Sequence, residues 1–165
     1  MTGRLAGLPP LIDARARVLV LGSFPSAASL AARRYYAHPK NQFWRILEAL
    51  LEQPLADSDY ATQQVVVQAA GLAIWDVYAS CERAGSLDSA IQNAQANDFR
   101  ALTKHAPQLR RICFNGKTAA RFAKPLAALG YDMVIAPSTS PAYTLAFDEK
   151  LDAWRAAIGG FLVRA

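Results

Sequence analysis

The stretch Val18-Leu19-Val20-Leu21-Gly22-Ser23-Phe24-Pro25-Ser26 begins as a continuous apolar run and ends as a tight turn. A continuous apolar run is typical of a strand that is buried on both faces of a parallel sheet. Gly22 allows backbone N–H groups to approach a ligand closely, and Pro25 stiffens the turn. The alternative interpretation is a turn that only leads from a strand into a loop. A serine-hydrolase elbow is excluded because the G-x-S-x-G pattern is missing.

Three more apolar runs of strand length follow, and helical patterns lie between the runs. The further predicted strands are Leu72–Trp75, Ile112–Phe114 and Met133–Ala136. The predicted helices are Asn41–Leu51, Ala61–Ala70, Asn97–His105, Thr118–Leu129 (kinked or split by Pro125) and Asp148–Leu162. Alternation of this kind predicts a three-layer α/β/α sandwich around a four-stranded, mostly parallel sheet. We expect residues 1–165 to form a single domain, because this length suffices to bury a core.

Each predicted strand ends in polar or turn residues. These ends are Gly22-Ser23, Asp76, Asn115-Gly116-Lys117 and Pro137-Ser138-Thr139-Ser140-Pro141. In open parallel sheets the ligand crevice lies outside the carboxyl ends of the strands. The sequence therefore predicts a site at this edge of the sheet.

The composition describes an ordinary globular protein, with 53% hydrophobic and 19% charged residues. No apolar run approaches the ~20 residues of a membrane helix, and residues 1–10 lack the pattern of a signal peptide, so we expect a cytoplasmic protein. The net charge of +5 is compatible with a polyanionic partner. Its arginines cluster at Arg15/Arg17, Arg33/Arg34 and Arg110/Arg111, so phosphate contacts are expected from a folded surface.

Cys81 and Cys113 are the only cysteines of the chain. Two cysteines are too few for a four-cysteine zinc site or an iron–sulfur cluster, and we expect plain buried thiols. His38 and His105, without suitably spaced carboxylates, offer no persuasive metal site. We therefore expect no metal and no cofactor.

The segment Tyr35-Tyr36-Ala37-His38-Pro39-Lys40-Asn41-Gln42-Phe43-Trp44 surrounds one amide with aromatic side chains. Such a group suits a pocket that grips a planar heterocycle. Asn41 stands where a helix is expected to begin, so an N-cap is the alternative role of its amide.

Together, G-S-F-P-S and Y-A-H-P-K-N-x-F-W resemble the uracil-DNA glycosylase superfamily, more closely its mismatch-specific branch and most closely its hypoxanthine (deoxyinosine) glycosylase branch. The resemblance implies a monofunctional DNA glycosylase of base excision repair, without lyase activity or cofactor. It implies that the enzyme acts as a monomer on DNA containing deaminated bases. Hypoxanthine is the first substrate expected and uracil the second.

The resemblance also implies roles for individual residues. Phe24 stands where most branches carry an Asp or Asn that activates water; the hypoxanthine branch shares this departure and places the catalytic amide in its HP[K/R]N motif, here at Asn41. An amide can hold and orient a water towards a developing sugar cation. Tyr36 stands where relatives stack an aromatic ring on the flipped base.

Asp76 ends the second predicted strand, where the family places its base-recognition side chain. A carboxylate accepts a hydrogen bond from the N1–H of hypoxanthine or the N3–H of uracil, whereas the N1 of adenine has only a lone pair. This difference would discriminate deaminated from normal adenine. The alternatives are that Asp76 pairs with Arg83 or caps the next segment.

Ser138–Ala142 stands where the superfamily has the loop that enters the minor groove. Ser138 replaces a histidine of many relatives and Ala142 replaces a leucine wedge, for which Tyr143 is a possible substitute. The alternative is a simple hydroxyl-rich turn. Lys117, at a predicted helix start, is a further candidate for a phosphate contact.

The expected site thus comprises three sets of residues. The catalytic residue is Asn41, and the base-binding residues are Gly22, Ser23, Phe24, Pro25, Tyr36, His38, Phe43 and Asp76. The DNA-binding residues are Ser26, Lys40, Ser80, Lys117, Ser138, Thr139, Ser140, Pro141 and Ala142.

Two other functions fit parts of the pattern, and a third does not. A uracil or thymine mismatch glycosylase with little inosine activity would use the same fold. A non-catalytic nucleic-acid-binding domain would explain Phe24 in the first turn. The absence of G-x-G-x-x-G and Walker motifs argues against a nucleotide-binding flavodoxin-like module.

Overall fold

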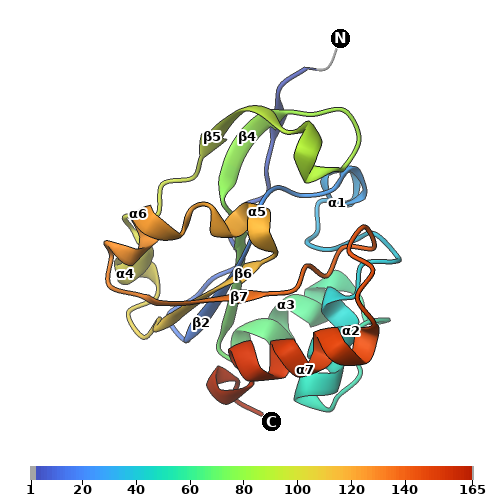
Figure 1. Ribbon diagram of the computed structural model, residues 1–165. Helices are drawn as coiled ribbons and strands as arrows, with labels where there is room; N and C mark the ends of the chain where they lie inside the picture. The colour runs from blue at the N-terminus through green and yellow to red at the C-terminus, as the bar shows by residue number, and fades with distance from the viewer. Residues whose placement is uncertain (1–2, 165) are drawn as a thin grey trace.

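The computed structural model describes residues 3–164, and its centre is a sheet of four parallel strands (Figure 1). The strands are β2 (Val18–Gly22), β3 (Leu72–Asp76), β6 (Arg111–Asn115) and β7 (Asp132–Ala136), in the order β3-β2-β6-β7. The four predicted strands are confirmed. All three pairings are parallel, so the carboxyl ends of the strands meet at one edge.

Helices cover both faces of this sheet (Figure 1). One face carries α2 (Phe43–Leu51), α3 (Tyr60–Ala69) and α7 (Phe147–Ile158), and the other carries α4 (Leu102–His105), α5 (Lys117–Ala120) and α6 (Ala123–Ala127). Val18 and Val20 of β2 belong to the first hydrophobic cluster, while Leu19 and Leu21 belong to the second. The continuous apolar run of β2 therefore reflects burial on both faces, and the three-layer sandwich is confirmed.

Two predicted helices are shorter than expected. The helix expected over Asn97–His105 forms only as α4, because the Asn97 side chain donates to the carbonyl of Asp76 at 2.8 Å instead of capping a helix. The helix expected over Thr118–Leu129 is split into α5 and α6. The break falls at Arg121-Phe122, since the ring of Pro125 clashes with the carbonyl four residues before it. At the end of the chain, α7 gives way to a 3₁₀ turn, η2 (Gly159–Phe161).

A second, antiparallel sheet lies at the end of the molecule where the parallel strands finish (Figure 1). It consists of β1 (Leu5–Ala6), β4 (Tyr78–Glu82) and β5 (Gln92–Ala96), with the turn η1 (Asp88–Ala90) between β4 and β5. The apolar pattern does not predict this sheet, because β5 is polar and exposed along its length. The short helix α1 (Ala27–Ala32), capped by Ser26, is also unpredicted.

Within residues 3–164, none of the helices has the length and apolar character needed to cross a membrane. Both cysteines of the described chain are buried and unpaired.

Candidate base-binding pocket

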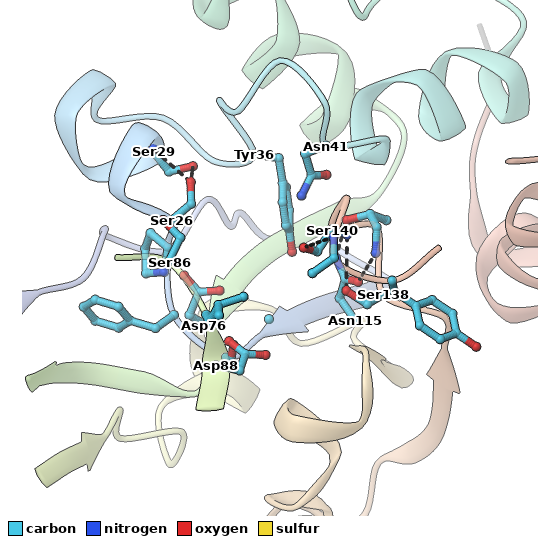
Figure 2. A pocket seen from close by; sticks show the side chains of 18 of the residues that line it. Ser26, Ser29, Tyr36, Asn41, Asp76, Ser86, Asp88, Asn115, Ser138 and Ser140 are labelled. Atoms are coloured by element: carbon cyan, nitrogen blue, oxygen red, sulfur yellow. Dashed lines mark hydrogen bonds between the residues drawn. The ribbon is translucent and has the colours of Figure 1, made fainter. Parts of the chain in front are cut away.

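A pocket of about 330 Å³ opens at the carboxyl ends of the parallel strands, where the sequence predicts a site (Figure 2). This volume lies in the range of small-molecule sites, about 300–1,000 Å³. Predicted site residues among its lining are Gly22, Ser23, Phe24, Pro25, Ser26, Tyr36, Asn41, Asp76, Ser138, Thr139, Ser140 and Ala142. The first turn, the aromatic segment and the second strand end thus share one cavity.

Gly22 and Asp76 are neighbours across the β2–β3 pair. A Cβ atom at Gly22 would lie 2.6 Å from Asp76 Oδ1 and 3.2 Å from Tyr36 Oη. No side chain fits at residue 22 without moving these groups. The glycine therefore allows the Asp76 carboxyl to lie against the backbone of β2.

The Asp76 carboxyl is buried, with the residue 4% exposed, and its Oδ2 has no hydrogen-bond partner among the described residues. Burial raises the pKa of Asp76 to about 7, with a further contribution from the negative charge of Asp88 and an opposing one from Arg83. The alternative pairing of Asp76 with Arg83 does not form among the described residues: Arg83 donates to the carbonyls of Pro25 (2.6 Å) and Gly85 (2.9 Å). A buried, unpaired carboxyl oxygen costs free energy unless a ligand supplies a partner.

Tyr36 forms the wall of the pocket between Asp76 and Asn41 (Figure 2). Its φ of 54° is in the left-handed region, which is strained for a residue with a side chain. Its ring stacks on Phe43 with centroids 4.2 Å apart and an interplanar angle of 29°. Its hydroxyl is buried and has no partner within residues 3–164, and burial raises its pKa.

Asn41 lies just before α2, at the edge of the pocket. Its Oδ1 accepts a hydrogen bond from the Phe43 N–H at 3.0 Å, which is a capping contact at the start of α2, although the N-cap position itself is Gln42. Its side chain also lines the pocket, where it lies next to Tyr36 (Figure 2). A carbonyl oxygen has two lone pairs, so the capping contact leaves one free.

The turn Gly22–Ser26 is held by residues of the β4–β5 hairpin that sequence reasoning missed. Ser23 Oγ donates to Asp88 Oδ1 at 2.6 Å, and the Ala27 N–H donates to Ser86 Oγ at 2.9 Å. The Arg83 guanidinium also lies over the Phe24 ring at 5.2 Å. The glycine- and serine-containing segment at 84–89 indicates a turn, but nothing in the sequence indicates its contact with residues 22–27.

The loop after β7 is held by side chains of β6 and α7. The Asn115 side chain makes two hydrogen bonds with Thr139. It donates to the Thr139 Oγ1 and accepts from the Thr139 N–H, both at 3.0 Å. Lys150 of α7 is buried and donates to the carbonyl of Tyr143 at 2.7 Å. This loop is therefore an ordered wall of the pocket and not only a hydroxyl-rich turn.

Several expected site residues lie outside the pocket lining. Phe43 is fully buried beneath Tyr36, so it supports the ring that faces the cavity. His38 Nδ1 accepts the Lys40 N–H, and Ser80 Oγ accepts hydrogen bonds from Arg4 in the antiparallel sheet. Lys40, Lys117 and Pro141 are exposed.

Two arginine clusters lie at the opposite edge of the sheet from the pocket. Arg15, Arg17 and Arg110 border a separate hollow there, and Arg111, at the start of β6, pairs with Asp132. Of the three clusters, only Arg33/Arg34 lies in the segment between the first turn and Tyr36. Two of the three arginine clusters therefore add no positive charge to the edge of the sheet that carries the pocket.

Comparisons with known proteins agree with this fold. The family model described as the uracil DNA glycosylase superfamily matches residues 9–158, and the chain belongs to this superfamily. Two similar proteins named hypoxanthine DNA glycosylase come from Methanosarcina acetivorans (36% identity; 82% of this chain and 86% of that protein) and Methanosarcina barkeri (32% identity; 92% and 96%). The family and these relatives support a DNA glycosylase, a hydrolase that acts on N-glycosyl bonds and takes part in DNA repair.

A similar solved structure is the solution NMR structure of a Methanosarcina acetivorans protein with a provisional uracil DNA glycosylase assignment. It has a TM-score of 0.87 and 32% identity, and the match covers 96% of this chain and 99% of that one. The resemblance found in the sequence to this superfamily, and to its hypoxanthine branch, is thereby confirmed.

Proposed function

We propose that this protein is a monofunctional DNA glycosylase of base excision repair that extrudes a deaminated base, hypoxanthine first and uracil second, and hydrolyses its N-glycosidic bond. The observation that carries the proposal is the shared cavity of Asn41, Tyr36 and the buried Asp76. This arrangement offers an amide for water, a ring for stacking and a carboxyl for the base edge. The names of the two relatives support hypoxanthine as the first substrate.

In this proposal the base leaves the duplex and enters the pocket beside Tyr36. Extrusion costs a few kcal/mol and costs least at a mispair, which suits inosine and uracil opposite a normal base. The unpaired oxygen of Asp76 accepts the hydrogen bond of the ring N–H. Tyr36, backed by Phe43, stacks on the base, and such stacking is worth about 1–3 kcal/mol.

Asn41 then holds the attacking water by the free lone pair of its side-chain oxygen. An amide is a weak base, but cleavage through an oxocarbenium-like transition state needs little activation of water, because much of the glycosidic bond is broken before attack. The capping bond to Phe43 fixes the rotamer of Asn41, so the water is oriented in advance. None of the described lining residues is a lysine, which supports hydrolysis without a Schiff-base lyase step.

A panel of labelled oligonucleotides tests the proposal. Purified protein is incubated with duplexes that carry inosine, uracil, a thymine mismatch or xanthine, and alkali then cleaves at abasic sites. We expect the largest single-turnover rate with inosine, a smaller one with uracil, and no strand cleavage before alkali. Base release from uracil or thymine mismatches with little from inosine would assign the protein to the mismatch glycosylases.

A non-catalytic DNA-binding domain is the second candidate, and one observation favours it. Phe24 lines the pocket at the first turn without any acid or base group, and one lone pair of Asn41 is already used by α2. Such a domain would bind inosine or abasic DNA without releasing any base. The same panel, read together with a binding measurement, separates the two functions.

A further inference from the structure

A second carboxyl group, Asp88, reaches the pocket from a different part of the chain. Asp88 belongs to η1 in the β4–β5 hairpin, and Ser23 Oγ holds its Oδ1 at 2.6 Å. Asp76 and Asp88 both line the cavity (Figure 2). The two groups differ in environment: Asp88 is exposed and has a protein donor, whereas Asp76 is buried with an unpartnered Oδ2.

The groups around Asp76 leave it without a close counter-charge. Asp88 faces it from the hairpin and adds negative charge, while the Arg83 guanidinium is bound to two backbone carbonyls. The tyrosines at 35 and 36 are neutral, because burial raises the pKa of both. When two carboxyl groups share a site and one of them is buried, the buried group stays protonated at a pH at which an isolated carboxyl group would ionise.

We propose that Asp88 is a positioning residue whose charge, fixed by Ser23, acts together with burial to keep Asp76 as a neutral carboxylic acid that offers the base one donor and one acceptor. The inference rests on the proposed function. A carboxylic acid matches the lactam edge of hypoxanthine and uracil, because its carbonyl oxygen accepts the ring N–H and its hydroxyl donates to the ring carbonyl. In this form Asp76 is the hydrogen-bonding equivalent of an asparagine.

The protonation state of Asp76 also determines which hydrogen bonds it can make with adenine. A neutral acid matches the edge of adenine as well, since N1 accepts and the amino group donates. As pH rises, Asp76 ionises and its two oxygens only accept. Each base then keeps one hydrogen bond and sets one acceptor, O6 of hypoxanthine or N1 of adenine, against a carboxylate oxygen. Excision of hypoxanthine therefore falls with rising pH.

Single-turnover excision of inosine from about pH 5 to about pH 9 tests this assignment in four proteins. In the wild type the rate falls as pH rises through about 7. Asp88→Asn removes the neighbouring charge, so the alkaline fall moves to lower pH by about one unit. Asp76→Asn supplies a donor and an acceptor at every pH, so this fall disappears. Asp152→Asn, which removes an exposed carboxylate of α7 outside the pocket, leaves the profile unchanged.

The inference is overturned if wild type and Asp88→Asn show the same alkaline fall, or if Asp76→Asn retains it. Should Asp88→Asn fail to fold, Ser23→Ala releases Asp88 from the turn and is expected to shift the fall in the same direction. Absence of base release from the wild type at every pH contradicts the proposed function instead. An NMR titration of the Asp76 carboxyl carbon, with a lower midpoint expected in Asp88→Asn, then decides the inference without activity.

Discussion

Asn41 and Asp76 differ in how their polar atoms are satisfied, and this difference separates their roles. The oxygen of Asn41 has a backbone donor at the start of α2, so the protein itself fixes this side chain. Asp76 keeps an oxygen buried and unpaired. A fixed amide suits the positioning of water, whereas an unsatisfied carboxyl gains most when a base supplies its partner.

Asn41→Ala is expected to lower single-turnover base excision by about 100-fold or more, with little change in DNA affinity, because the water loses its anchor. The substitution also removes a helix-start contact, which costs about 1 kcal/mol of stability. Asp59→Ala is the matched control, since Asp59 caps α3 through the Thr62 N–H at 2.8 Å and lies outside the pocket. Equal loss of stability in both variants, with excision lost only in Asn41→Ala, is the expected result. If Asn41→Ala lowered DNA affinity and base excision equally, Asn41 would act only as a structural contact at the start of α2.

Two segments outside the parallel sheet, the β4–β5 hairpin and the loop after β7, complete the pocket. The hairpin holds the first turn through Arg83, Ser86 and Asp88. The loop is held by α7, where Trp154 Nε1 donates to the Pro137 carbonyl at 2.9 Å and Lys150 donates to the carbonyl of Tyr143. The side chain of Tyr143 itself remains 47% exposed at the pocket.

Tyr143→Ala tests whether this exposed ring fills the gap that the extruded base leaves in the duplex. We expect excision from double-stranded DNA to fall about tenfold or more, since a stacking ring is lost, while excision from single strands stays unchanged. The ratio of the two rates is the measurement. Val65→Ala, which truncates an exposed apolar side chain on α3 away from the pocket, is the control. An equal effect on both substrates would exclude a wedge.

Across the whole molecule, the residues of the candidate site lie at the carboxyl-end edge of the sheet, and basic residues border the opposite edge. The folded protein also retains a proton at Asp76 that the unfolded chain releases near the ordinary pKa of 3.8. Between about pH 4 and about 7 the folded state therefore binds more protons than the unfolded state. The free energy of unfolding consequently declines as pH rises through this window.

Asp76→Asn removes this decline in the free energy of unfolding, since an amide does not ionise and so carries no charge to bury. We expect the variant to melt several degrees above the wild type at about pH 8, and the difference to shrink as pH falls towards 4. Thermal unfolding followed by circular dichroism over this range is the measurement. A constant difference at all pH values would show that Asp76 does not titrate in the window.

The amino-acid sequence by itself determined the sandwich and the edge that carries the site. Continuous apolar runs such as Val18–Leu21 can be stable only when both faces are covered, and parallel strands bring their carboxyl ends together. Gly22, Tyr36, Asn41 and Asp76 follow from that rule and from the resemblance, and all line the pocket. These inferences depend on local pattern and on chain direction, which a sequence carries directly.

Only the tertiary structure decided which polar groups meet. The pairing of Ser23 with Asp88 joins residues 65 positions apart, and β5 has no apolar alternation that would place the hairpin over the first turn. The burial of Phe43 beneath Tyr36 likewise depends on the path of the loop before α2. Long-range hydrogen bonds between loop side chains leave no periodic trace in a sequence, so the second carboxyl of the pocket is found only in the folded chain.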